Sequence, residues 1–164
     1  TNNYKNLLAN VISQNTIFDI NEGDQDIVID RGASDGVREG LGVINENGVI
    51  IGKISEVRDH LSKVCLTTNS NCKFAATIQD QNRTMGITEG DLGLTIKMNY
   101  IPQSEKININ DTVITSGLGG DIPRGLVIGK VSQINNRSNE IWQDVNIGPL
   151  FDMSTLSIVA VLIP

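Results

Sequence analysis

The residues best suited to chemistry in this sequence are its single histidine, His60, and Ser116, which lies in a glycine-rich stretch. A serine protease built from two β-barrels supplies a histidine, an aspartate and a serine in that chain order. His60, Asp91 and Ser116 follow this order, but it is a weak signal in a chain with 19 acidic residues. Ser116 also lacks a preceding Gly-Asp, and the position of His60 between Asp59 and Leu61 is typical of a surface turn. A trypsin-like or degenerate serine hydrolase that uses Ser116 and His60 is therefore the alternative hypothesis.

Two glycine–lysine segments, 48–54 and 125–131, have some likeness to phosphate-binding loops. A phosphate loop has four residues between its glycines, and a serine or threonine follows its lysine. Here three apolar residues separate the glycines, and an aliphatic residue follows the lysine. The segments instead predict buried strands, each with a lysine that faces solvent.

No metal site or cofactor site is expected from the ligand types present. A structural zinc site takes four nitrogen or sulfur ligands, whereas the chain has one histidine and two cysteines. The cysteines, Cys65 and Cys72, either form one bridge in an oxidising compartment or stay as two half-buried thiols. The sequence leaves both states open.

Charge and composition narrow the classes of partner. The chain has 164 residues and a net charge of −6, and only 4% of its residues are aromatic. Nucleic acids and anionic lipids need clustered lysine and arginine, so an acidic chain argues against them as main partners. The few aromatic residues also make a stacking platform for bases unexpected. This length suits one large or two small domains.

The elements that must position these residues are short β-strands. About eleven apolar runs, separated by Gly, Asn and Asp, favour β-barrels or a sandwich. Asn47-Gly48, between two such runs, predicts a hairpin over residues 42–54. Strands do not alternate with helices, which disfavours a doubly wound nucleotide-binding fold.

The N-terminal segment is the one candidate helix. Its apolar residues recur at helical spacing, as in the last turns of a coiled coil. They are Tyr4, Leu7, Leu8, Val11 and Ile12. The rival interpretation makes residues 8–13 a first strand, and one option is that this strand completes a second barrel.

An internal repeat predicts two similar units. Gly48–Val57 matches Gly125–Ile134 position by position, and each copy carries a glycine in mid-strand, Gly52 or Gly129. A glycine inside a strand marks a bulge, a sharp bend or a close backbone approach, as barrel corners require. The sequence therefore predicts an all-β chain of two small tandem barrels.

The predicted domain bounds follow from the repeat. Each barrel is expected to hold about six strands. The end of the coiled-coil helix, or a first strand, is assigned to residues 1–12. The first barrel is assigned to residues 13–90 and the second to residues 91–164, with the break near Glu89-Gly90-Asp91.

The glycine-rich stretch is the most distinctive motif. Gly117, Gly119 and Gly120 are expected to supply turns with positive φ. The residues assigned to this motif, with a structural role expected for them, are Thr115, Ser116, Gly117, Leu118, Gly119, Gly120, Pro123, Gly125 and Gly129.

Several stretches resemble one bacterial family, the rod shape-determining protein MreC. Val28–Val37, Gly48–Val57 and Ser62–Thr68 resemble its first strand, its following hairpin arm and its Ser-Lys-Val run. The most specific match is Asp111–Val131, in which Thr-Ser-Gly is followed by Pro-x-Gly and Ile-Gly-x-Val. The resemblance covers nearly the whole chain, from about residue 9 to residue 163.

The resemblance implies a non-catalytic scaffold of the cell-elongation machinery. A family member has one N-terminal membrane helix, a coiled coil, and two small barrels on the outer face of the cytoplasmic membrane. It self-associates as dimers or filaments, and it works with MreB, MreD, RodA and a class B penicillin-binding protein to regulate peptidoglycan synthesis. The expected partner surface is a strand edge or an exposed apolar strip, because open barrels leave edges that accept a further strand.

Overall fold

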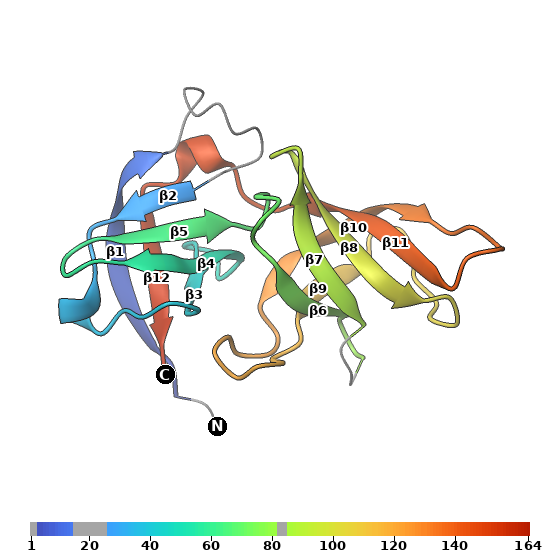
Figure 1. The fold of residues 1–164 in the computed structure, drawn as a ribbon, viewed down its shortest axis with the longest axis horizontal. Helices are drawn as coiled ribbons and strands as arrows, with labels where there is room; N and C mark the ends of the chain where they lie inside the picture. Colours follow the sequence, from blue (N-terminus) through green and yellow to red (C-terminus); the bar gives the residue numbers. More distant parts are fainter. Residues whose placement is uncertain (1–2, 15–25, 82–84) are drawn as a thin grey trace.

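The computed structural model describes residues 3–14, 26–81 and 85–164, and it is built from antiparallel strands. These strands form two closed barrels of six strands each, which lie side by side (Figure 1). The predicted all-β class, the two barrels and the number of strands are confirmed. No helix of the described residues is long and apolar enough to cross a membrane.

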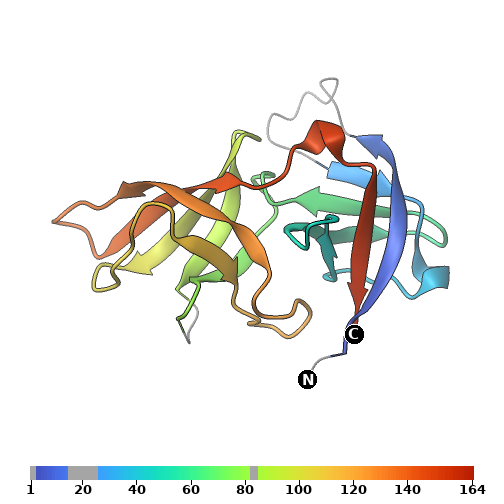
Figure 2. The ribbon, with the colours of Figure 1, turned by 180° about the vertical axis from the view of Figure 1, so that it is seen from behind.

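The first barrel is formed by strands from both ends of the chain. Its strands, in order around the barrel, are β1 (Lys5–Gln14), β12 (Ile158–Ile163), β3 (Gly42–Ile44), β4 (Ile50–Val57), β5 (Ser62–Leu66) and β2 (Asp26–Ile29). A short 3₁₀ turn, Ala33–Asp35, lies between β2 and β3. The strands β1 and β12 run side by side (Figure 2), with Lys5 opposite Ile163.

The second barrel is formed by one continuous middle part of the chain. Its strands, in order around the barrel, are β10 (Val127–Asn135), β11 (Trp142–Pro149), β8 (Thr95–Pro102), β7 (Gly86–Asp91), β6 (Phe74–Ile78) and β9 (Thr112–Thr115). A second 3₁₀ turn, Met153–Thr155, lies on the path from β11 back to β12.

The predicted end of a coiled-coil helix at residues 1–12 is wrong over the residues that the structure describes there. Residues 5–14 are strand β1, which pairs with β12 on one side and β2 on the other. Leu7, Ala9 and Val11 pack into the first core, whereas Leu8 and Ile12 are exposed. This alternation is that of a strand. The rival interpretation, a strand over 8–13, is correct, but the strand belongs to the first barrel.

The predicted break at residues 90 and 91 also differs from the strand pairing. The strands β6 and β7 belong to the second barrel, and β12 belongs to the first. The chain therefore enters the second barrel through residues 67–73 and returns to the first through residues 150–157. Hydrophobic pattern alone does not reveal these pairings, because the partners lie far apart in the sequence.

The two mid-strand glycines lie where a neighbouring strand comes very close. A Cβ on Gly52 would overlap the Cys65 carbonyl, and one on Gly129 would overlap the Gly148 carbonyl. The partner strands are β5 and β11, so equivalent positions of the repeat have equivalent roles in the two barrels. The close backbone approach predicted from the repeat is confirmed.

Each barrel has its own apolar interior. Ile29, Val43 and Val161 are among the fully buried residues of the first barrel's core. The core of the second barrel extends across the junction, because it includes Ile50 and Cys65 from β4 and β5. The two barrels are therefore joined by buried apolar contacts as well as by the chain.

Candidate functional site

The glycine-rich motif forms a loop between β9 and β10, and hydrogen bonds hold its two ends together. The Thr115 hydroxyl donates to the Pro123 carbonyl at 2.7 Å and accepts from the Leu126 amide at 3.0 Å. The Gly125 amide donates to the Thr115 carbonyl at 3.0 Å. The φ angles of 80°, 93° and 81° at Gly117, Gly119 and Gly120 confirm the predicted positive values. Gly125 also has a positive φ, of 100°.

This loop contacts the first barrel. Asp121 accepts a hydrogen bond from Arg38 at 2.9 Å, and the two side chains form a half-exposed ion pair. The Tyr4 hydroxyl donates to the Gly120 carbonyl at 3.3 Å, and Ile122 packs on the core that continues across the junction. The motif therefore helps to position one barrel against the other.

A small cleft of about 160 Å³ opens between this loop and the first barrel. One wall contains Lys53, whose ammonium lies 4.9 Å from the centre of the Phe74 ring and donates to the Lys73 carbonyl. Burial lowers the pKa of Lys53 below its ordinary value. The half-buried Lys53 ammonium contacts Phe74 and Lys73, and Asp121 is paired with Arg38, so both charged groups of the cleft already have partners within the protein.

The structure does not bring Ser116 and His60 together. The Ser116 hydroxyl accepts from the Leu118 amide at 3.3 Å within the glycine-rich loop of the second barrel. His60 lies in the turn between β4 and β5 of the first barrel, where its Nδ1 is 3.0 Å from the Ser34 hydroxyl. Because a serine nucleophile needs an adjacent base, this geometry does not support the hydrolase hypothesis. Within the described part of the chain, no group of three potential metal ligands is found.

A second surface lies on the outer side of the second barrel, where β8 and β11 pair. Tyr100 and Trp142 meet edge to face there, with ring centres 6.4 Å apart. Tyr100 and Trp142 are 62% and 49% exposed, and Ile141, which precedes Trp142 in the chain, is 78% exposed. We call the paired side chains of Tyr100 and Trp142 the aromatic patch. Single exposed apolar residues are ordinary on a protein surface, but a cluster with two aromatic residues is typical of a docking surface.

The backbone beneath the aromatic patch is held in an unusual conformation. Tyr100 has a φ of 62°, and the pairing of β8 with β11 shifts register beside it. The buried Gln143 side chain ties this region together by donating to the carbonyls of Pro102 and Glu105, at 3.0 and 2.7 Å. A positive φ at a bulky residue costs on the order of 1–3 kcal/mol, so the surrounding structure fixes how Tyr100 is displayed.

Sequence reasoning did not find the aromatic patch. The low aromatic content argued against a stacking platform for bases, and no functional role was predicted for Trp142. One signal was present, since the sole tryptophan follows an isoleucine directly after the polar stretch 135–140. The partner residue, Tyr100, is more than 40 positions away, and only the pairing of β8 with β11 brings the two rings together.

Comparison with known proteins agrees with this architecture. The barrel-core model of the rod shape-determining protein MreC matches residues 17–163. The chain is 34% identical to the cell shape-determining protein MreC of Listeria monocytogenes, over 97% of this chain and 54% of that protein. It is 30% identical to that of Bacillus subtilis, over 97% of this chain and 57% of that protein. The chain thus spans about half the length of these curated relatives.

Solved structures have the same fold. MreC from Listeria monocytogenes superposes with a TM-score of 0.82 at 30% identity, covering 98% of this chain and 76% of that one. The major periplasmic domain of the cell shape-determining filament MreC also gives a TM-score of 0.82, at 25% identity, covering 97% of this chain and 95% of that one. From the match across both barrels, we conclude that this chain belongs to the MreC family of rod shape-determining proteins.

Proposed function

We propose that this chain is the extracytoplasmic part of a non-catalytic scaffold that regulates peptidoglycan synthesis during cell elongation. Membership of the MreC family supports this role, as does the separation of Ser116 from His60. One relative is described as a periplasmic domain of a filament, which supports a location outside the cytoplasmic membrane and self-association. In the whole protein, an N-terminal membrane helix and coiled coil would anchor it beside MreD, RodA and the MreB system.

The proposed partner is the class B penicillin-binding protein of the same organism. A Helicobacter pylori MreC has been solved in complex with its penicillin-binding protein PBP2, and it has this fold at a TM-score of 0.72 and 19% identity. We place the contact on the aromatic patch, because its two rings are exposed and pack edge to face against each other. This exposed pair of aromatic rings is the observation that carries the proposal.

Strand addition at a barrel edge is not the mode of docking that we propose. The described strands close into two barrels, so neither sheet ends in an unpaired strand. We infer instead that the partner contacts side chains on the surface of a barrel. The other surface expected from the sequence is an exposed apolar strip, and we propose the aromatic patch in that role.

Calorimetry with the extracytoplasmic part of the cognate penicillin-binding protein tests the proposal. We expect saturable binding with a negative heat-capacity change, since apolar surface becomes buried. Trp142→Ala should weaken binding by about 30-fold or more, the loss typical of a hot-spot residue. Leu8→Ala is the matched control, because Leu8 is 62% exposed on the first barrel and should leave binding unchanged.

Two outcomes would count against the proposal. Equal affinities for the Trp142→Ala and Leu8→Ala variants would remove the aromatic patch as the docking surface. If no heat appears even with the chain extended by its native upstream segment, which restores avidity, this partner is wrong.

A further inference from the structure

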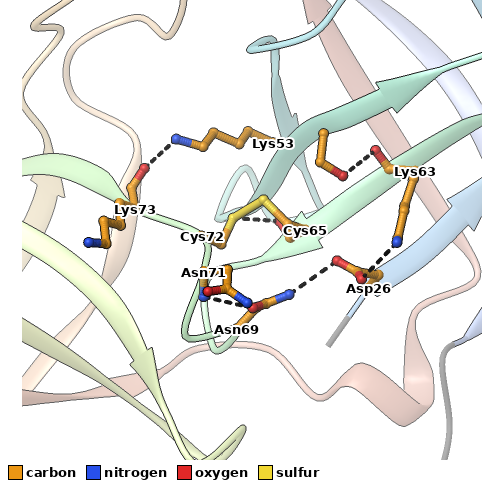
Figure 3. Close-up of a disulfide and its surroundings, with 9 residues drawn as sticks. Asp26, Lys53, Lys63, Cys65, Asn69, Asn71, Cys72 and Lys73 are labelled. Carbon is orange, nitrogen blue, oxygen red and sulfur yellow. Dashed lines mark hydrogen bonds and ion pairs between the residues drawn. A yellow bond between two sulfur atoms is a disulfide. The ribbon is translucent and has the colours of Figure 1, made fainter. Parts of the chain in front are cut away.

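The first connection between the barrels carries a disulfide. Cys65 is in β5 of the first barrel, and Cys72 lies at the end of linker 67–73, just before β6 of the second barrel. Figure 3 shows the bridge between them, and their Cα atoms are 5.7 Å apart, a normal separation for a disulfide. The two states left open by the sequence are thus resolved in favour of the bridge.

The bridge lies inside the protein, at the junction. Cys72 is fully buried, and Cys65 is 7% exposed. Both belong to the apolar core of the second barrel, together with Ile50 of β4 and Phe74 of β6. The disulfide therefore joins a strand of one barrel directly to the core of the other.

The linker is also held by polar contacts to both barrels, and Asn69 takes part in several of them. Its side-chain nitrogen donates to Asp26 of β2 at 3.1 Å, and its side-chain oxygen accepts from the Asn71 amide at 2.8 Å (Figure 3). Its carbonyl accepts from the amides of Cys72 and Gly90, each at 3.0 Å. Gly90 is in β7, so the turn at Asn69 contacts both barrels at once.

The ion pair between Arg38 and Asp121, which joins the two barrels at the surface, is a weaker restraint than these contacts. Arg38 and Asp121 have side chains that are 54% and 50% exposed. Exposed ion pairs of this kind add little, because water screens them and two flexible side chains must be ordered. The hydrogen bond from Tyr4 to Gly120 is likewise at the surface. The disulfide at the linker therefore adds a covalent restraint to the buried apolar contacts that join the two barrels.

We propose that the disulfide between Cys65 and Cys72 is a permanent clamp on the joint between the two barrels. It forms when the two thiols give up two electrons and two protons to a disulfide-bonded oxidant, which becomes two thiols. Once the joint has packed, a reductant cannot reach the buried sulfur atoms without local opening. The clamp limits rotation of one barrel against the other and preserves any binding surface that spans both.

Hydrogen exchange on the same chain, oxidised or reduced, tests the clamp. The reduced sample is made by unfolding in reductant and refolding with reductant present, so that no side chain is replaced. Reopening a loop of this length should speed exchange of the Cys72 and Gly90 amides by on the order of 50-fold. Amides inside the barrels, such as Ile96 in β8, should keep their protection. Small-angle scattering should show a broader range of barrel-to-barrel distances in the reduced sample.

Three results would overturn the proposal. The first is equal exchange at Cys72 and Gly90 in both samples. The second is loss of protection at Ile96 as well, because the bridge would then stabilise the whole fold and not the joint. The third is rapid reduction of the folded protein, measured by alkylation and mass, at a rate that matches reduction in denaturant. A Cys65→Ala/Cys72→Ala variant must behave like the reduced sample.

Discussion

Replacing Gly129 by alanine adds one methyl group at a point where the neighbouring strand β11 leaves no room for it. The new Cβ would overlap the Gly148 carbonyl oxygen and lie 2.7 Å from Cγ2 of Ile147. The carbonyl cannot retreat freely, because Lys130, next to Gly129, is paired with Gly148 in the β10–β11 ladder. Both atoms must give way, so the ladder opens locally and the Ile147 side chain also shifts in the core.

The loss of stability can be worked out from these two changes, the shift in the core and the opening of the ladder. Overpacking a core costs about 1–3 kcal/mol. Losing a ladder hydrogen bond adds about 1 kcal/mol. We therefore expect Gly129→Ala to lower the free energy of unfolding of the second barrel by about 3 kcal/mol. With a urea m-value of about 2 kcal/mol/M, the unfolding midpoint falls by about 1.5 M.

Tryptophan fluorescence is the assay, since the only tryptophan of the chain, Trp142, is in β11 of the second barrel. Gly148→Ala is the matched control. It adds the same methyl group on the facing strand, where the nearest atom, the Lys130 carbonyl oxygen, is 3.9 Å away. This control should shift the midpoint by less than about 0.3 M. If the two variants shift it equally, the close approach is not what requires glycine at position 129.

Three further predictions concern polar contacts. Asn69→Ala should lower the free energy of unfolding by about 1–2 kcal/mol in a urea titration, because it removes a hydrogen bond to the buried Asp26 carboxylate. Hydrogen bonds from the Asn10 side chain and amide lower the pKa of Asp30. The ionised Asp30 therefore stabilises the fold at pH values above its unfolded-state pKa, and this stabilisation is lost as pH falls through its folded-state pKa. In an NMR titration, Asn10→Ala should therefore raise that pKa, and an unmoved value would contradict the assignment. Arg38→Ala removes only a half-exposed ion pair, so in a urea titration it should lower the free energy of unfolding by less than about 1 kcal/mol.

Local sequence signals predicted most of the strands, because each depends on neighbouring residues. Asn47-Gly48 gives the expected turn between β3 and β4, and Gly48 has a φ of 78°. The paired glycines of the repeat mark equivalent close approaches in both barrels. The N-terminal strand was misassigned because Leu7, Leu8 and Val11 satisfy a helical period as well. Its true state is decided by β12, about 150 residues away, which no local period can reveal.

The candidate site was harder to predict from the sequence than the strands were, because it also depends on contacts between distant segments. The glycine-rich motif was found because positive φ strongly favours glycine. The aromatic patch was missed because Tyr100 and Trp142 become neighbours only through the pairing of β8 and β11. The state of Cys65 and Cys72 depended on the course of linker 67–73. Its Asn69-Ser70-Asn71 run is typical of a turn, but a turn signal alone does not say whether the two sulfur atoms meet. Local sequence patterns thus did not predict the contacts between distant segments of the chain.

The pairing of β1 with β12 has a consequence for how the protein is made. The second barrel is one continuous segment, so all of its strands are available once residue 149 has been synthesised. The first barrel has to wait for β12, the last strand in the chain. Until β12 has been made, the other strands cannot close the barrel, and they leave unpaired edges that are prone to join a neighbouring chain. The second barrel can therefore fold early, whereas the first barrel is completed last, when β12 pairs with β1.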